Sequence, residues 1–350
     1  MEESPYAIHY LGKTYNTTIH KDLTDEEYEQ VVKEYYTKPD FELVQKQFKT
    51  ISKGGVKINH ITNYYVKDLM AKVKLFYNNW SIEEALLYKP LVEFFAGKAD
   101  KNKKVFPDSH SLCKKIETAF RLCGFKTASK PSNFPMKSID ELLENYNVNN
   151  KYYDFSCGWG VRLLSSLKHN VEYYGTDPNT VLCERLQQMG DDYKTTVGCK
   201  TNFHIYSQGS EKVIPQLENQ IGLAFSSPPY FNLEDYKIGD QSYKPGVSYD
   251  SWKENYLEPT IKNIYKYLID DGYFAININN FNNYNDYDLV GDTYEIALFS
   301  GFELVDILPM KNITRCSGHK EWNKGDVCWH DNDEKIMVFQ KEKEKINGEN

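Results

Sequence analysis

The stretch KYYDFSCGWGVRLLSSLKH, residues 151–169, contains a short apolar strand, a glycine-rich turn and a helix in direct succession. Glycine adopts backbone conformations that are closed to other residues, so Gly158 and Gly160 predict a tight turn that a ligand can approach. The helix that follows presents free N–H groups and the positive end of its dipole to this turn. The third glycine of the dinucleotide fingerprint is absent, which argues against a nicotinamide site.

Strands and helices continue to alternate after this stretch. Further apolar strands are expected at 171–177, 202–208, 221–227, 273–280, 303–310 and 334–341, and a long helix at 256–272. Such alternation requires crossover connections, so it predicts a mostly parallel sheet with helices on both faces. The expected fold is an α/β, Rossmann-like doubly wound domain, whose ligands bind at the carboxyl ends of the strands.

The second strand of the series ends in GTDP, which contains Asp177 and Pro178. An acidic side chain at this end can accept hydrogen bonds from both hydroxyls of a ribose, which predicts a nucleoside-binding role for Asp177. The alternative is a helix N-cap before the next helix, a place where aspartate is common. The glycine turn upstream favours the ribose interpretation.

The fourth strand ends in FSSPPYF, residues 225–231. Proline has no backbone N–H and cannot continue a central strand, so the strand must stop at this point. The hydroxyl of Ser227, a rigid Pro-Pro corner and the ring of Tyr230 then follow one another at the predicted ligand edge. A structural turn with a buried tyrosine is the alternative to a catalytic motif.

With a glycine turn after strand one, an acid after strand two and Ser227-Pro228-Pro229-Tyr230 after strand four, the chain resembles the exocyclic-amino DNA methyltransferases. That family uses S-adenosylmethionine to methylate cytosine N4 or adenine N6, and it carries an Asp/Asn/Ser-Pro-Pro-Tyr/Phe/Trp tetrapeptide. The resemblance covers roughly residues 131–341 and implies a seven-stranded methyltransferase sheet. It also implies cofactor contacts from Phe134, Asp154, Phe155, Ser156, Gly158, Gly160, Asp177, Pro178, Ser210 and Ser226.

The chemistry of the family accounts for the residue types in the tetrapeptide. An exocyclic amine is a poor nucleophile because its lone pair is delocalised into the ring. The resemblance implies that the side-chain oxygen of Ser227 and the carbonyl of Pro228 accept its two hydrogens, with Pro229 making the corner rigid. Tyr230 would stack on a base that has left the duplex. No covalent intermediate is needed, so Cys157 is expected to be a small turn residue and not a nucleophile.

Several positions depart from the family pattern. DFSCG stands where Asp-Pro-Phe-x-Gly is common, Trp159 fills a place often held by serine, and Ser210 stands where an aspartate often contacts the cofactor adenine. Serine at the first motif position favours cytosine N4 over adenine N6. Related Pro-Pro-Tyr motifs also act on RNA or on glutamine side chains, and an inactive DNA-binding protein with this fold is a further alternative.

The N-terminal part is predicted to be helical, with one helix over 63–80. We expect a helical, DNA-binding domain over 1–125 and the methyltransferase domain over 126–350. Residues 43–130 hold 17 lysines and arginines against 7 acidic residues, although the whole chain has a net charge of −8. This asymmetry predicts a basic surface that attracts the phosphates of double-stranded DNA. Solvated lysines on helical faces are the alternative.

The remaining features predict a cytoplasmic protein that does not enter a membrane. No apolar run reaches the roughly 18 residues of a membrane span, and no signal peptide is expected at the N-terminus. Seven scattered cysteines argue against a disulfide framework. Zinc ligands could come from Cys316, His319, Cys328 and His330, but the spacing of the second pair is unusual, and no metal is predicted.

Overall fold

The structure is a computed structural model that describes residues 8–10, 13–15, 20–75, 80–101, 107, 109–122, 128, 130–280, 287–309 and 335–342. The chain divides into two compact units, here called the helical unit and the sheet unit. The helical unit comprises Met1–Asp40, Val66–Ser132 and Leu233–Ile238, and the sheet unit comprises Phe41–Tyr65, Asn133–Asn232 and Gly239–Asn350. This division differs from the expected boundary near residue 125. The Cys316–His330 group lies outside the described residues.

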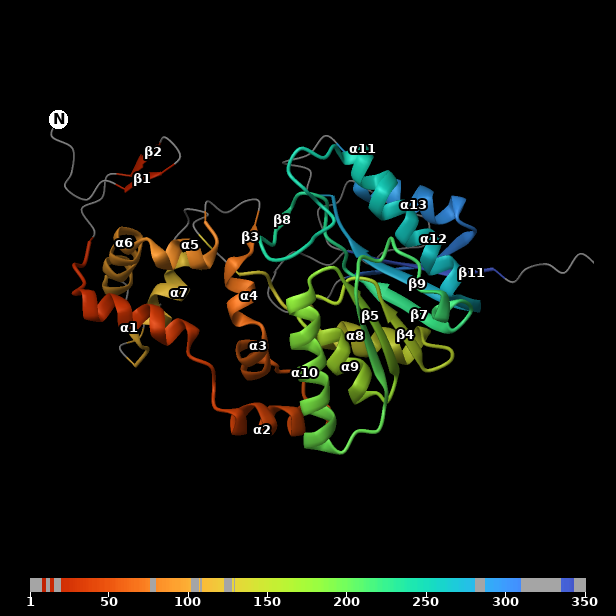
Figure 1. The fold of residues 1–350 in the computed structure, drawn as a ribbon, viewed down its shortest axis with the longest axis horizontal. Helices are drawn as coiled ribbons and strands as arrows, with labels where there is room; N and C mark the ends of the chain where they lie inside the picture. The colour runs from red at the N-terminus through yellow and green to blue at the C-terminus, as the bar shows by residue number, and fades with distance from the viewer. Residues whose placement is uncertain are drawn as a thin grey trace, which may run out of the picture. The chain divides into compact units, whose positions relative to one another are not determined.

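The sheet unit is built on seven strands, as predicted (Figure 1). In spatial order they are β10 (Phe302–Pro309), β11 (Lys335–Lys341), β9 (Leu268–Ile278), β7 (Ile221–Ser226), β4 (Lys151–Asp154), β5 (Glu172–Asp177) and β6 (Phe203–Ser207). The five strands from β9 to β6 pair in parallel, and β11 is antiparallel to both of its neighbours. The predicted Rossmann-like doubly wound α/β fold is therefore confirmed.

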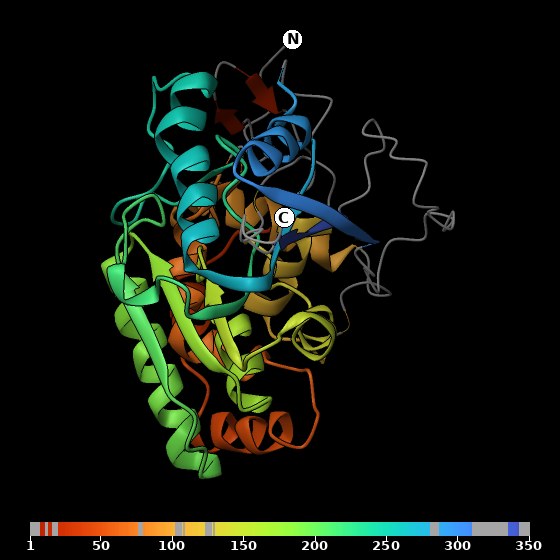
Figure 2. The same cartoon turned by 90° about the vertical axis from the view of Figure 1, so that its right-hand side faces the viewer.

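Helices cover both faces of the sheet (Figures 1 and 2). One face carries α8 (Met136–Tyr146), α9 (Val161–Lys168) and α10 (Thr180–Val197), and the other carries α12 (Glu258–Tyr267) and α13 (Leu289–Phe299). Every residue of β7 is buried, as expected for a parallel strand at the centre of such a sheet. The carboxyl ends of β4, β5 and β7 consequently lie at one edge.

The helix expected over 256–272 is shorter than predicted. It ends at Tyr267, and β9 begins at Leu268, which pairs with Ile221 of β7. The helix is preceded by α11 (Tyr249–Trp252) and a π-helical turn, Lys253–Leu257. Pairing with the neighbouring strand thus overrides the helical pattern of the segment after Tyr267.

Two helices from the N-terminal part belong to the sheet unit. Helices α2 (Phe41–Ile51) and α3 (Asn59–Tyr65) pack against α10, as Figure 1 shows. Phe48 meets Tyr193 edge to face at 5.5 Å, and the Tyr65 hydroxyl donates to Asp192 Oδ2 at 2.6 Å. The helix predicted over 63–80 is therefore interrupted after Tyr65, where the chain passes from one unit to the other.

The helical unit has its own core. Its helices are α1 (Asp25–Tyr36), α4 (Lys67–Lys72), α5 (Ile82–Leu87), α6 (Lys89–Asp100) and α7 (Leu112–Leu122). Apolar side chains from α1, α5, α6 and α7, including Val31, Phe95 and Ile116, form one buried cluster. The unit also contains the short pairs β1 (Ile8–Tyr10) with β2 (Lys13–Tyr15), and β3 (Lys74–Leu75) with β8 (Glu234–Asp235). Within the described residues, none of the helices has the length and apolarity to cross a membrane.

Candidate active site

The turn after β4 takes the glycine-dependent form that was predicted. Gly158 and Gly160 have φ values of +56° and +87°, in the left-handed region that favours glycine. A Cβ atom on Gly160 would lie 2.7 Å from the Met189 sulfur, so this glycine also allows α10 to pack closely. Helix α9 begins at the next residue, Val161, with its N-terminus at the turn.

A buried ion pair between Asp154 and Arg162 stabilises this turn. Asp154 is fully buried, and its Oδ2 accepts hydrogen bonds from Arg162 Nε and from the Tyr173 hydroxyl, each at 2.9 Å. Arg162 also donates to the Ser156 carbonyl. Burial raises the pKa of the Asp154 carboxyl, and the Arg162 guanidinium opposes that rise. These contacts are internal, so Asp154 supports the turn through Arg162.

The side chains of Phe155, Ser226 and Cys157, all near this turn, are also buried. Phe155 packs in the core beside Phe274, with ring centroids 5.9 Å apart. Ser226 is fully buried and donates to the Ser156 carbonyl at 3.2 Å. Cys157 is also buried, and burial raises the pKa of its thiol well above the ordinary value. A protonated, buried thiol is a poor nucleophile. This agrees with the expectation that Cys157 is a small residue that fits a tight turn.

Asp177 lies at the carboxyl end of β5 and is partly exposed, as is Pro178. Its Oδ1 accepts from the Asn179 backbone N–H at 3.0 Å. Removal from water raises the pKa of Asp177 to about 7, against the lowering effect of the Asn179 N–H group. The N-cap of α10 is Asn179, whose side chain accepts from Leu182 N. The alternative N-cap role for Asp177 is therefore filled by another residue.

Ser210 lies in the loop after β6, and its side chain contacts α12. It is buried, and its hydroxyl lies 3.0 Å from that of Thr260 on α12. The nearby π-helical turn presents Tyr256, which is 7% exposed. Burial raises the pKa of Tyr256, and the nearby hydroxyls of Ser156 and Ser210 oppose that rise. Tyr256 therefore lies close to the loops after β4 and β6, a position that the sequence pattern did not reveal.

The segment before α8 adds an aromatic ring and an unpaired acceptor. The ring of Phe134 is partly exposed and lies 5.4 Å from the ring of Phe225 and 5.8 Å from Arg162 Cζ. The preceding residue, Asn133, has a buried Oδ1 with no hydrogen-bond partner among the described residues. A buried acceptor without a donor is costly, which indicates a donor that a ligand would bring.

The SPPY turn begins where β7 ends. Ser227 is partly exposed, Pro228 is buried and Tyr230 is 8% exposed. Asn277, near the end of the adjacent strand β9, donates from Nδ2 to Ser227 Oγ at 3.3 Å and to the Tyr230 hydroxyl at 3.0 Å. The Tyr230 hydroxyl in turn donates to the Asn277 backbone carbonyl at 3.1 Å. Asn277 was missed, although a polar residue within a buried strand is a signal.

A cluster of aromatic rings holds the chain that leaves this turn. Phe231 has a φ of +54°, a strained conformation for a bulky residue. Its ring contacts those of Tyr243, Tyr249, Trp252 and Tyr287 at centroid distances between 5.1 and 5.6 Å. The cluster compensates the strain with packing and fixes the direction in which the chain leaves the motif.

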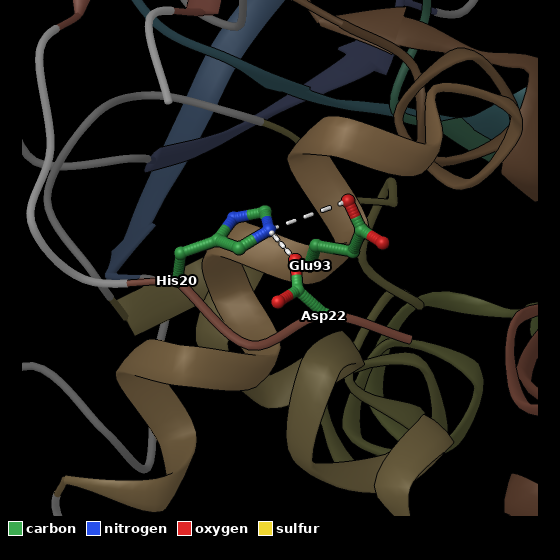
Figure 3. Close-up of side chains that lie close together, drawn as sticks. All are labelled: His20, Asp22 and Glu93. Carbon is green, nitrogen blue, oxygen red and sulfur yellow. Dashed lines mark hydrogen bonds and ion pairs between the residues drawn. The ribbon is translucent and has the colours of Figure 1, made fainter. Parts of the chain in front are cut away.

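In the described residues, one group of potential metal ligands occurs, in the helical unit: His20, Asp22 and Glu93 (Figure 3). His20 Nε2 lies 2.9 Å from Asp22 Oδ1 and 3.6 Å from Glu93 Oε2. Glu93 Oε1 accepts from the Leu23 backbone N–H at 3.1 Å. These contacts satisfy the three side chains and attach the segment before α1 to α6, which is a structural role.

No family model matches the chain, and no curated protein matches it. Similar solved structures include a TehB-like SAM-dependent methyltransferase from Corynebacterium glutamicum, with 16% identity, 64% of this chain and 92% of that chain covered and a TM-score of 0.37. An rRNA methylase from Streptococcus thermophilus has 13% identity, 59% and 95% coverage and a TM-score of 0.35. At such values these likenesses carry no argument about the activity of this chain, which therefore rests on its own residues.

Proposed function

We propose that this chain is an S-adenosylmethionine-dependent methyltransferase that modifies an exocyclic amino group of a DNA base. One observation carries the proposal: the SPPY turn, the glycine turn and Asp177 follow β7, β4 and β5, which are neighbours in the parallel sheet. Carboxyl ends of parallel strands share one edge, so a nucleoside bound at Asp177 and an amine bound at Ser227 would occupy one site.

The residues at this edge fit the proposed cofactor. The partly exposed carboxylate of Asp177 would accept the ribose hydroxyls, with Pro178 beside it, and the loops at Gly158 and Ser210 would line the nucleoside. Phe134 and Asn133 Oδ1, which has no partner among the residues that the structure describes, would meet the methionine part, which carries an ammonium donor. When bound, S-adenosylmethionine supplies an electrophilic methyl group on a sulfonium.

The motif residues would activate the amine. Ser227 Oγ and the Pro228 carbonyl would each accept one N–H, which holds the nitrogen closer to tetrahedral and aims its lone pair at the methyl carbon. The new N–C bond forms as the C–S bond breaks, and the amine then loses a proton to solvent. The buried thiol of Cys157 takes no part. Serine at position 227 favours cytosine N4 over adenine N6.

Basic residues of the sheet unit support a nucleic-acid substrate. In the sheet unit, the segment 41–65 contains four lysines and one acidic residue, and Lys46, Lys49 and Lys53 are exposed on or beside α2. Replacing these three by alanine should weaken DNA binding and reduce its salt dependence by about 0.9 in log–log slope per lost phosphate contact. Replacing the exposed Lys200, Lys212 and Lys262 by alanine is the matched control. Equal losses of DNA affinity from both sets would contradict a DNA-binding surface on α2.

The deciding experiment incubates the protein with tritiated S-adenosylmethionine and unmethylated genomic DNA, and then separates the digested nucleosides. Label on N4-methylcytosine, or on N6-methyladenine, with loss of label in Ser227→Ala and Tyr230→Ala, would establish the reaction and the base. Absence of label on DNA while S-adenosylhomocysteine still binds would refute the DNA substrate and direct the assay to RNA and then to glutamine-containing protein. Absence of cofactor binding would refute the methyltransferase.

A further inference from the structure

The hydroxyl of Tyr230 carries an inference that rests on the proposed function and deepens it. A residue that only stacks on a base needs a ring and no hydroxyl, and the motif in the resembling family accepts Tyr, Phe or Trp at this place. In this chain, however, the hydroxyl lies 3.4 Å from Ser227 Oγ and 3.1 Å from the Asn277 carbonyl. These contacts determine whether Ser227 Oγ donates or accepts a hydrogen bond.

Hydrogen counting sets the direction of each bond. A tyrosine hydroxyl has a single hydrogen, and Tyr230 donates it to the Asn277 carbonyl, which can only accept. In the contact between Ser227 and Tyr230, the hydrogen must therefore come from Ser227. One lone pair of Ser227 Oγ receives the Asn277 Nδ2 hydrogen, at 3.3 Å. The second lone pair remains, on a residue that is partly exposed.

The same conclusion holds for the other orientation of the Asn277 amide. As described, Asn277 Oδ1 is buried and has no hydrogen-bond partner among the described residues. Rotation of the amide by 180° would bring Oδ1 to the place of Nδ2, where it would accept the hydrogen of Ser227. In both orientations Ser227 donates its hydrogen within the protein, to Tyr230 in the first and to Asn277 Oδ1 in the second, and at least one lone pair of Ser227 Oγ remains for a ligand.

We propose that Tyr230 and Asn277 are positioning residues that make Ser227 an obligate hydrogen-bond acceptor. A serine hydroxyl can otherwise donate or accept, whereas a target amine offers only hydrogens to it. The relay from Ser227 through Tyr230 to the Asn277 carbonyl removes the donor option before the substrate arrives. It therefore selects an amino group over a carbonyl oxygen at the same position of the base, which is the difference between cytosine and uracil.

The experiment compares Tyr230→Phe, which keeps the ring, with the wild type, and uses Tyr273→Phe as a matched control. Tyr273 also lies on β9 and its hydroxyl accepts from Gln340, far along the strand from Asn277. On the DNA identified by the methylation assay, Tyr230→Phe should lower kcat about tenfold with little change in KM. The double variant Ser227→Ala/Tyr230→Phe should be no slower than Ser227→Ala alone.

A binding measurement gives a signature that a merely structural role would not produce. With S-adenosylhomocysteine present, the affinity for an oligonucleotide carrying the target base is divided by that for its deaminated counterpart. Tyr230→Phe frees the Ser227 hydrogen to donate to the keto oxygen, so this ratio should fall about tenfold relative to the wild type. An unchanged ratio together with wild-type kcat would overturn the relay while leaving the methyltransferase intact.

Thermal unfolding tests the relay even if no methyl transfer is found, which would refute the proposed function alone. The Tm losses of Ser227→Ala and Tyr230→Phe should be non-additive, because both remove the same hydrogen bond. Additive losses would show that the two hydroxyls are independent and would overturn the relay. The Tyr273→Phe loss should add to that of Ser227→Ala.

Discussion

The turns after β4 and β7 follow neighbouring strands of one sheet, but their polar side chains differ in how many hydrogen-bond partners they find within the protein. After β4, the buried carboxylate of Asp154 accepts hydrogen bonds from Arg162 and Tyr173 within the protein. After β7, Ser227 is partly exposed, and Asn277 Oδ1 has no hydrogen-bond partner within the part of the chain that the structure describes. The side chains beneath the first turn thus stabilise it internally, whereas the second turn presents Ser227 for the substrate contact proposed above.

Backbone strain shows the same contrast. The positive φ angles of the first turn fall on Gly158 and Gly160, where they cost little. In the second turn a positive φ falls on Phe231, which needs an aromatic cluster to hold it. Strain of this kind gathers at functional sites, which is consistent with the substrate-activating role proposed for the second turn.

The largest effect is expected from Arg162→Leu, which breaks the completed turn. Removing one partner of a buried pair leaves the Asp154 charge uncompensated, so the free energy of unfolding should fall by about 3–5 kcal/mol. Urea unfolding measures the change. The double variant Asp154→Leu/Arg162→Leu should recover most of the loss, since no isolated charge remains. A single variant within 1 kcal/mol of the wild type would contradict the structural role.

Ser227→Ala tests the second turn. Loss of an acceptor aimed at the reacting amine should lower kcat by about 10²–10³-fold. Because Ser227 is partly exposed, the free energy of unfolding should change by less than about 1 kcal/mol. Parallel kinetics and urea unfolding separate the two quantities. A variant that is clearly destabilised but turns over normally would favour a purely structural Pro-Pro turn.

The smallest effect is expected at Asp177. Its carboxylate accepts an internal hydrogen bond, as that of Asp154 does, but it is partly exposed, as Ser227 is. The ionised carboxylate is the better acceptor for ribose hydroxyls, and its pKa in the free protein is raised to about 7. S-adenosylhomocysteine affinity should therefore fall as the pH is lowered, by about tenfold between pH 8 and pH 6.

Calorimetric titration at several pH values measures this dependence. Asp177→Asn should bind more weakly at pH 8 and lose the dependence, because its amide does not titrate in this range. A pH profile that is the same in the wild type and in Asp177→Asn would assign the titration to another group and weaken the ribose interpretation.

Local signals in the sequence were sufficient to predict the sheet and the turns that follow β4 and β7. Apolar runs separated by helical segments predicted all seven strands, and the strand end before Pro228 follows from the missing N–H of proline. The glycine turn was equally predictable, since the positive φ of Gly158 and Gly160 is a property of the residue type. These features depend on neighbours along the chain, which a sequence displays directly.

Tertiary structure decided the rest. The start of β9 at Leu268, the break after Tyr65 and the separation of α2 and α3 from the other N-terminal helices depend on packing against distant segments. The partners of the site were equally hidden, because Asn277 reaches Ser227 only through the pairing of β7 with β9. Residue types along the chain specified which groups can react. The register between strands far apart in sequence determined which of those groups find hydrogen-bond partners within the protein.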